Sequence, residues 1–396
     1  MSGTVVANHL VDGLVYLDHA ATTPMRAEAI AAMQPFHDQL FANPSGSHRF
    51  AREARRIVDE SRDDVADVLG CTPGEVIFTG GGTEGDNAAI LGAMRRNGAH
   101  AVCSAAEHHA VLHCVEHGAR TGHGTVVGVT ATGHVDIDQL SDALAGLVAR
   151  DIVPVVSVMA VNNEVGTVTP MVDVVRVVRN VAPRAVIHTD AVQAACWLDL
   201  AELTTLVDIL TLSSHKFGGP KGAGVMYQRN GIHLEPLILG GGQERDRRSG
   251  THNVAGIAAT SAALRVTATH RSADFERVEG LRHRLLVGLE ACGGVAVTIP
   301  PEASVPGIVH VCVEGVENEA LLYLLDEEGV CASAASACAS GAMEPSHVLA
   351  AMGVPRQRAM GALRLSLGHT TTEADIDRAI VVISASIRRL RERTRP

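Results

Sequence analysis

The feature that most constrains the fold is a regular alternation of short β-branched runs with helical stretches between about Pro73 and Arg229. The apolar runs are EVIFT, HAVCS, TVVGV, VPVVSVM, AVIHTD, VDILTLSS and AGVMYQ. Such alternation is typical of a parallel sheet with helices on both faces, because parallel strands need a crossover connection. The sequence therefore predicts an α/β fold around a mainly parallel sheet.

The length and the later segments indicate more than one folding unit. The chain has 396 residues, of which 46% are hydrophobic, so it can bury a large core. After the Gly-rich stretch LGGGQERDRRSGTHN, a long helical pattern begins at about Val254, and a shorter α/β segment with runs such as GIVHVCV and NEALLYLLDEEG follows. We expect a large domain over residues 26–265 and a smaller C-terminal α/β domain over residues 266–396, with residues 1–25 packing against the small domain.

Composition argues against several classes of function. The formal net charge is −11 with acidic residues dispersed along the chain, which argues against direct binding of a nucleic-acid backbone. The N-terminus lacks a basic start followed by an apolar run, and no apolar stretch approaches the roughly 20 residues of a spanning helix. We therefore expect a cytoplasmic protein without membrane contact. Its eight cysteines show no CxxC spacing, which fits neither a disulfide framework nor a zinc ribbon.

We expect the reactive side chains just after the strands, because ligands of such sheets bind beyond the carboxyl ends of the strands. In LSSHKFGGPKG a strand ends and Lys216 follows in a turn-rich stretch. A lysine amine forms a Schiff base with an aldehyde only when it is partly deprotonated, which requires burial or nearby positive charge. A surface lysine before a Gly-Pro turn is the alternative for this residue alone.

Two further strand ends favour pyridoxal 5'-phosphate (PLP) as the aldehyde. Asp190 ends AVIHTD and could pair with a protonated pyridine nitrogen, although such an Asp can also be a turn or cap residue. FTGGGTEGDN joins a strand through glycines to a helix start, where free N–H groups and the hydroxyl of Thr83 suit a phosphate; helix capping is the alternative. The stretch contains neither GxxxxGK[ST] nor GxGxxG, which argues against ATP and NAD.

The histidines of CSAAEHHAVLHC allow two interpretations. His108 follows a strand and could stack on a cofactor ring and move protons near neutral pH. His109, His113 and His117 recur at i, i+4 spacing beside Cys114 and could instead form a metal-binding stripe. The stretch has no HExxH pattern and no carboxylate partner, so a solvated helix face explains the stripe more simply.

Ten ordered motifs resemble those of the group I cysteine desulfurases, which are class V PLP enzymes of fold type I. The resemblance covers nearly the whole chain and is carried by YLDHAATTPM, FANPSGSHRF, EVIFTGGGTEGDN, AEHHAVL, VNNEVGTVTP, HTDAVQ, SSHKFGGPKG, GGGQERDRRSGT, SACASGAMEPSHVL and LRLSLGHTTTEADID. It implies a large PLP-binding domain with a seven-stranded sheet, a small domain that carries a catalytic cysteine loop, and L-cysteine as the substrate.

The resemblance also implies roles for individual residues. Lys216 would hold PLP covalently, His108 would stack on the ring and transfer protons, and Asp190 would pair with the ring nitrogen. The remaining cofactor contacts would come from Gly82, Thr83, Asn163, Gln193, Ser213, His215 and Thr251. Of these, Thr251 resembles a residue that the neighbouring subunit lends to the phosphate, which implies a homodimer. Asn163 and Arg364 would orient the substrate, Arg364 by clasping its carboxylate.

Cys338 in SAASACASGAMEPS decides the reaction type that the resemblance implies. It would take the sulfur of L-cysteine as a persulfide and release alanine, whereas Cys331 is expected to be structural. A selenocysteine lyase, a class V aminotransferase and a catalytically silent scaffold are the alternatives. No resident metal is expected, apart from a transient contact of Cys338 with an iron–sulfur cluster.

The sulfur acceptor is expected to be a separate protein. The end RRLRERTRP lacks the acidic and aromatic tail that housekeeping members use to dock an iron–sulfur scaffold protein. Iron–sulfur assembly and a dedicated pathway such as DNA phosphorothioation or tRNA thiolation both remain open.

Overall fold

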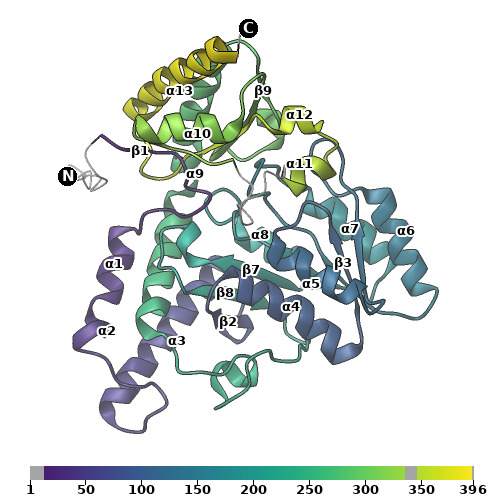
Figure 1. Ribbon diagram of the computed structural model, residues 1–396. Helices are drawn as coiled ribbons and strands as arrows, with labels where there is room; N and C mark the ends of the chain where they lie inside the picture. The colour runs from purple at the N-terminus through teal and green to yellow at the C-terminus, as the bar shows by residue number, and fades with distance from the viewer. Residues whose placement is uncertain (1–12, 335–345, 395–396) are drawn as a thin grey trace.

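A seven-stranded sheet forms the centre of the larger of two lobes in the computed structural model, which describes residues 13–334 and 346–394 (Figure 1). Its strand order within these residues is β2-β8-β7-β6-β5-β3-β4. The strands are β2 (Val76–Thr79), β3 (His100–Ser104), β4 (Gly124–Val127), β5 (Pro154–Ser157), β6 (Val186–Asp190), β7 (Ile209–Ser213) and β8 (Gly224–Gln228). Neighbouring strands are parallel except that β8 runs antiparallel to β2 and β7. The predicted mainly parallel seven-stranded sheet is confirmed.

The sheet is covered on both faces, which explains its continuous apolar runs. Every residue of β2, β3, β5, β7 and β8 is buried. The helices of the larger lobe are α1 (Ala27–Met33), α2 (Pro35–Asp38), α3 (Arg49–Leu69), α4 (Gly82–Asn97), α5 (His109–Ala119), α6 (Ile137–Val148), α7 (Met171–Val181) and α8 (Leu200–Leu206). Across the described ranges, no helix combines the length and the apolar character needed to cross a membrane.

The smaller lobe has its own core. Its antiparallel sheet has the order β12-β10-β9, with β9 (Val295–Val297), β10 (Ile308–Val313) and β12 (Ala362–Ser366). Its helices are α10 (Asn318–Glu327), α11 (His347–Ala351), α12 (Arg356–Ala359) and α13 (Glu373–Thr394). A separate parallel pair joins β1 (Val15–Tyr16) to β11 (Val330–Cys331). This pairing brings the N-terminal segment onto the smaller lobe.

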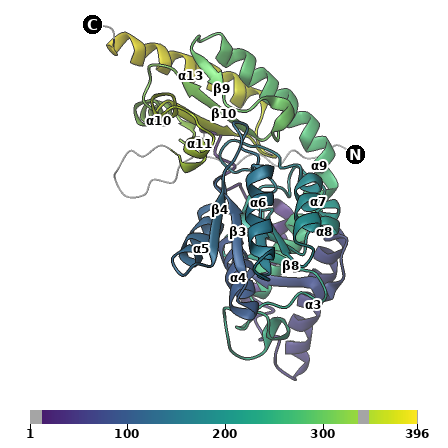
Figure 2. The same ribbon diagram turned by 90° about the vertical axis from the view of Figure 1, so that its right-hand side faces the viewer.

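One long helix connects the lobes. The helix α9 (Val254–Glu290) runs along one side of the molecule in both views (Figures 1 and 2). Its first half, up to Leu264, belongs to the core of the larger lobe, and its second half, from Val278, belongs to the core of the smaller lobe. The predicted boundary at residues 265 and 266 therefore falls within a continuous helix, and the division of the chain into domains stays a prediction.

Strand β6 is unusual because three buried polar side chains occupy its carboxyl end. His188, Thr189 and Asp190 are 0%, 0% and 4% exposed. Buried polar groups are tolerated when they are hydrogen-bonded. The Nδ1 atom of His188 lies 2.8 Å from Ser157 Oγ, and Thr189 Oγ1 donates to Val158 O at 2.8 Å. The polar side chains at the end of β6 therefore have hydrogen-bond partners within the protein. The strand ends at the pocket described below.

The sheet core should be far more sensitive to truncation than the helix surface. Val156 on β5 is 0% exposed, whereas Val381 on α13 is 67% exposed. Deleting two buried methyl groups removes transfer energy and leaves a cavity, so Val156→Ala should lower the free energy of unfolding by about 2–3 kcal/mol. The matched control Val381→Ala should change it by less than about 0.5 kcal/mol. Denaturant unfolding of the cofactor-free protein measures both, and equal effects would contradict the assigned core.

Candidate active site

A pocket of about 420 Å³ opens at the carboxyl ends of the parallel strands, where the two lobes meet. Residues from the N-terminal segment, the central sheet and strand β12 all contribute to its wall. The lining residues are Ala20, Ala21, Gly82, Thr83, Asp86, His108, Met159, Asn163, Asp190, Val192, Gln193, Ser213, His215, Lys216, Ser333 and Arg364. A concave site of this volume with convergent polar groups is typical of a small-molecule or cofactor site.

Lys216 lies in a short 3-10 turn directly after β7. Its Nζ donates to the carbonyl oxygens of Ala20 at 2.6 Å and Ala21 at 2.8 Å, so the N-terminal segment fixes the position of the amine. Burial, together with the positive charge of Arg364, lowers the pKa of Lys216 to about 8. At pH 7 about a tenth of the amine is therefore unprotonated, far more than for an ordinary lysine, and nucleophilic attack on a carbonyl requires this form.

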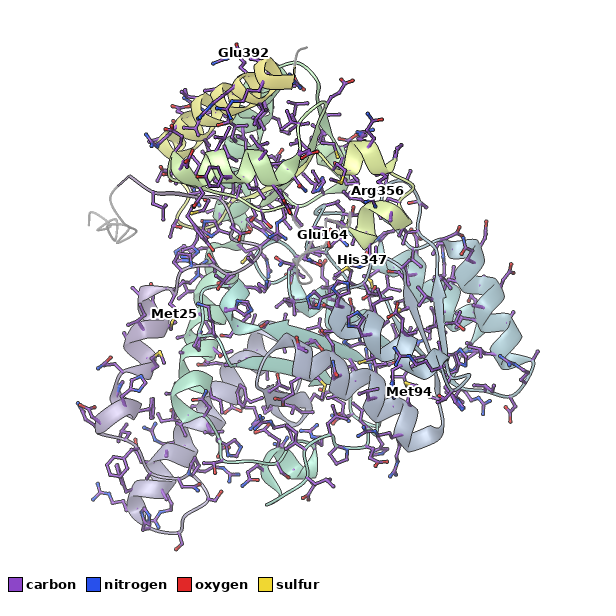
Figure 3. All side chains as sticks on the ribbon, viewed as in Figure 1. Met25, Met94, Glu164, His347, Arg356 and Glu392 are labelled. Atoms are coloured by element: carbon purple, nitrogen blue, oxygen red, sulfur yellow. The ribbon has the colours of Figure 1, made fainter. Side chains whose placement is uncertain are left out.

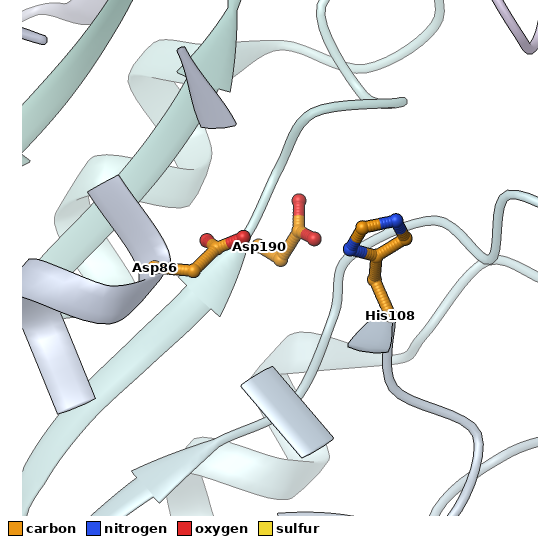
Figure 4. Close-up of side chains that lie close together, drawn as sticks. All are labelled: Asp86, His108 and Asp190. Atoms are coloured by element: carbon orange, nitrogen blue, oxygen red, sulfur yellow. The ribbon is translucent and has the colours of Figure 1, made fainter. Parts of the chain in front are cut away.

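Asp190 ends β6 at the bottom of the pocket. Its Oδ1 accepts a hydrogen bond from the backbone N–H of Val192 at 2.8 Å. Burial raises the pKa of Asp190 to about 6, while that hydrogen bond and the charge of Lys216 act in the opposite direction. Figure 4 shows Asp190 with the side chains of Asp86 and His108 converging beside it. The carboxyl can therefore become the anionic partner of a positively charged group that enters the pocket.

The N-terminus of α4 provides an anion site at one end of the pocket. Gly81, the N-cap residue, has φ 147° and offers no side-chain cap, so the first N–H groups of α4 lack a capping partner. A Cβ on Gly82 would lie 2.8 Å from Val192 Cγ2, so only glycine fits this close approach. Ser213 and His215 line the same pocket. Free N–H groups at a helix start, with the helix dipole, suit a phosphate.

His108 is the N-cap residue of α5. Its Nδ1 accepts from the backbone N–H of Ala110 at 3.1 Å, so in the neutral ring Nε2 carries the proton. Desolvation, and then the charge of Lys216, lowers the pKa of His108 to about 4. The ring is therefore neutral near pH 7 and can accept a proton within the pocket.

The predicted alternative of a histidine metal stripe finds no support in the geometry. Cys114 is buried and donates to Ala110 O at 3.1 Å, so it does not face outward with the histidines of α5. Among the described residues, Asp86, His108 and Asp190 are the one set of His, Cys, Asp and Glu ligands whose atoms all lie within 4.8 Å of one another. That set lies inside the pocket and not on the helix surface.

Arg364 reaches the pocket from β12 of the smaller lobe. One guanidinium nitrogen donates to Asn163 O at 2.9 Å and another donates to Asp18 Oδ1 at 2.8 Å. The side chain is buried, and its Nε has no hydrogen-bond partner among the residues that the structure describes. A buried guanidinium with an unused donor can bind a carboxylate that enters the pocket.

A second set of contacts joins α11 to the larger lobe beside the pocket. Ser346 Oγ donates to Glu164 Oε2, and the ring of His347 hydrogen-bonds the carbonyl oxygen of Glu107 at 2.9 Å. Figure 3 shows Glu164 and His347 near each other at this junction. Ser346 directly follows residues 335–345, so these contacts fix the chain where the segment containing Cys338 ends.

Most of the residues singled out from the sequence come together around this one pocket. These are Gly82, Thr83, His108, Asn163, Asp190, Gln193, Ser213, His215, Lys216 and Arg364. Thr251 is exposed and does not line the pocket of its own chain. Cys338 lies outside the described residues. Two contributions to the pocket were not predicted from the sequence. These are Asp86, which stands in the GTEGDN motif, and the backbone of Ala20 and Ala21, which no side-chain pattern identifies.

Comparison with known proteins gives matches over nearly the whole chain. Residues 15–379 match the family described as Aminotransferase class-V. The chain is 39% identical over 381 residues to a protein of Methanosarcina thermophila named cysteine desulfurase IscS, covering 95% of this chain and 93% of that protein. A solved structure named NifS-like protein has a TM-score of 0.85 and 34% identity and covers 94% of this chain and 98% of its own. Another, described as SspA in complex with cysteine, has a TM-score of 0.75 and 30% identity, with 89% and 98% covered.

The charges around Lys216 predict opposite shifts in two variants. Arg364 lowers the pKa of Lys216 and Asp190 raises it. In cofactor-free protein, acylation of Lys216 should be half-maximal near pH 8, with the midpoint higher in Arg364→Gln and lower in Asp190→Asn. Peptide mass spectrometry across pH gives each midpoint.

Lys221 is the only other lysine of the chain and is exposed. Its acylation in the same digest is therefore an internal control for the activity of the reagent. Midpoints that stay fixed, or that move in the same direction in both variants, would contradict the charge arrangement.

Proposed function

The chain belongs to the class-V aminotransferase family, and we propose that it is a PLP-dependent cysteine desulfurase that converts L-cysteine to L-alanine and carries the sulfur on Cys338. The observation that carries this proposal is the convergence of a reactive lysine, a buried aspartate, an anion-binding helix start and a buried arginine in one pocket. Groups of these four kinds would together bind PLP and an amino-acid substrate.

The residues of the pocket fit PLP. The amine of Lys216 would bind its aldehyde, the carboxylate of Asp190 would pair with its ring nitrogen, and the N-terminus of α4 with Ser213 and His215 would hold its phosphate. Among the described residues, the buried Nε of Arg364 in the pocket wall has no hydrogen-bond partner, as expected where a polar molecule completes the site. When bound, PLP supplies an electron sink that stabilises negative charge on the α-carbon of an amino acid.

Arg364 would orient the substrate. Its guanidinium is already held by Asp18 and Asn163, so little conformational freedom remains to be lost when a carboxylate binds. The unpartnered Nε leaves one donor free for that carboxylate. Fixing the carboxylate also fixes where the α-carbon and the thiol of cysteine point. The complex named SspA with cysteine, a similar structure, supports this choice of substrate.

Proton movements would be shared between Lys216 and His108. With a pKa of about 8, Lys216 can take the α-proton of the substrate and return it. His108 is neutral because its pKa is lowered to about 4, and it would take the thiol proton only transiently, during its transfer. Positive charge on either group lowers the pKa of the other, so a proton on one favours its removal from the other.

The sulfur would leave by nucleophilic transfer to Cys338, which lies outside the described residues. Its thiolate forms an S–S bond with the substrate sulfur while the Cβ–S bond of cysteine breaks, and the electron pair of that bond stays on carbon. Protonation of Cβ then completes alanine, and Cys338 keeps the sulfur as a persulfide. No external oxidant is needed, because the substrate carbon is reduced as the sulfur is oxidised.

A homodimer, a cytoplasmic location and a separate sulfur-acceptor protein belong to the same proposal. Thr251 is exposed and does not line its own pocket, which supports its contribution to the phosphate site of a second copy. The acceptor would receive the persulfide sulfur for iron–sulfur assembly or for a dedicated thiolation pathway.

Replacement of Cys338 tests the proposed function directly. With L-cysteine and dithiothreitol, the protein should release alanine and sulfide in equal amounts. Cys338→Ser should abolish both, because the sulfur then has no acceptor within the protein. Cys331→Ser, a control on β11, should keep the activity. Unchanged alanine release in Cys338→Ser would contradict the proposal. Turnover of L-selenocysteine alone, or of an amino donor with a keto acid, would favour a lyase or an aminotransferase.

Replacement of His108 tests the proton transfer. His108→Gln, assayed with saturating PLP, should lower the rate of alanine formation by about 10²- to 10⁴-fold because the proton acceptor is lost. His117→Gln, on the exposed surface of the same helix, is the matched control and should leave the rate unchanged. Equal rates in the two variants would remove His108 from the mechanism.

A further inference from the structure

Three carboxylic acids are buried together beneath the pocket. Asp86 on α4, Glu107 after β3 and Asp190 at the end of β6 are 1%, 0% and 4% exposed. Glu107 Oε1 accepts from Ser104 Oγ at 2.9 Å and from the backbone N–H of Met159 at 2.8 Å, and Asp190 Oδ1 accepts from a backbone N–H. Asp86 Oδ1, in contrast, has no hydrogen-bond partner in the described part of the chain.

Asp86 and Asp190 are close enough to interact strongly. Ligand oxygens of the two carboxyls lie within 4.8 Å of each other, and Figure 4 shows Asp190 between Asp86 and His108. At this separation inside a protein, two negative charges repel each other by an amount that strongly disfavours ionisation of both. At least one proton is therefore held by the pair.

Within residues 13–334 and 346–394, no lysine or arginine forms an ion pair with Asp86. The basic side chain beside it is His188, whose Nε2 lies 3.6 Å from Asp86 Oδ1. Burial lowers the pKa of His188 to about 3, so the ring is neutral. Its two nitrogens are occupied, Nδ1 by Ser157 Oγ at 2.8 Å and Nε2 by Thr211 Oγ1 at 3.1 Å.

Thr211 also explains a local feature of the sequence. A Cβ on Gly85 would lie 2.6 Å from Thr211 Cγ2, so a glycine at this position lets α4 approach β7 and brings Asp86 against His188 and Thr211. Thr211 lowers the pKa of Asp86 and so acts against the larger, opposite effect of burial. The surroundings of Asp86 are therefore packed and neutral.

The charge of Lys216 acts on Asp190. Lys216 lowers the pKa of Asp190, whereas burial, Asp190 and Glu107 all raise the pKa of Asp86 well above its ordinary range. Burial raises the pKa of Glu107 to about 8, so that acid adds little charge near pH 7. His108, the third member of the group in Figure 4, is neutral. The proton of the pair therefore belongs on Asp86.

We propose that Asp86 is a positioning residue that stays protonated and shares its proton with Asp190, so that the pair presents a single negative charge to the ring nitrogen of the cofactor. The neutral acid donates toward Asp190 and holds that carboxylate in place, and it adds no second charge. This inference rests on the proposed function only where it names the cofactor ring as the partner of Asp190. The proton on Asp86 is a property of the cofactor-free protein.

The first test uses cofactor-free protein and infrared difference spectra in the carboxylic-acid C=O stretching region. At pH 7 an acid band should be present that disappears in Asp86→Asn. In Asp190→Asn that band should remain and should be lost at a lower pH than in the unmodified protein, since removal of the neighbouring charge lowers the pKa of Asp86. Absence of an acid band assignable to Asp86 at pH 7 would overturn the inference even if the protein is a desulfurase.

The second test measures the dissociation constant of PLP and the pH dependence of its absorbance. Asp86→Asn is neutral and still has a donor, so it should bind PLP about as well as the unmodified protein, with an unchanged absorbance midpoint. Asp86→Leu lacks the donor and should weaken binding by about 10- to 100-fold. Thermal unfolding of the cofactor-free variants separates this effect from a loss of folding.

A shift of the absorbance midpoint by about one unit or more in Asp86→Asn would overturn the inference, because it would mean that an ionised Asp86 had been removed. Equal binding by the Leu and Asn variants would also overturn the positioning role. Failure of every form to bind PLP would instead contradict the proposed function, and the infrared result would stand by itself.

Discussion

The site depends on one lysine amine that is kept partly neutral by the way the chain is folded around it. Burial and the charge of Arg364 lower the pKa of Lys216 to about 8, and the carbonyl oxygens of Ala20 and Ala21 hold its Nζ. These contributions come from the N-terminal segment, the end of β7 and strand β12. The pKa of Lys216 therefore depends on the position of the smaller lobe, which carries Arg364.

The sheet beneath the pocket also holds few ionised side chains. A parallel sheet buried on both faces offers little solvation for ions, so His188 is neutral and the acids around Asp190 hold protons. Asp190 is the exception because the N–H of Val192 and the charge of Lys216 favour its ionised form. Asp190 therefore provides the negative charge that pairs with a positively charged ring nitrogen in the proposed function.

The sequence was sufficient to predict the parallel sheet, because β-branched runs repeat with helix-length spacing. It also placed Lys216, Asp190 and Thr83 at one edge of the sheet, because each lies at the end of such a run or within four residues after it. It could not predict the carbonyl oxygens of Ala20 and Ala21, since backbone atoms leave no residue signature. Asp86 was also missed: within GTEGDN it resembles an ordinary helix residue, and only the approach of α4 to β6 shows that it is buried beside Asp190. Long-range packing decides both cases.

The most direct test of the account is to fix the cofactor on the protein by chemical reduction. Protein reconstituted with PLP should be treated with borohydride, digested and analysed by mass spectrometry, with the chain's two lysines, Lys216 and Lys221, as the candidate sites. We predict one pyridoxyl group per chain, on Lys216, with Lys221 unmodified. A label on Lys221, or no stoichiometric label at all, would contradict the assignment of the reactive amine on which the rest of the account depends.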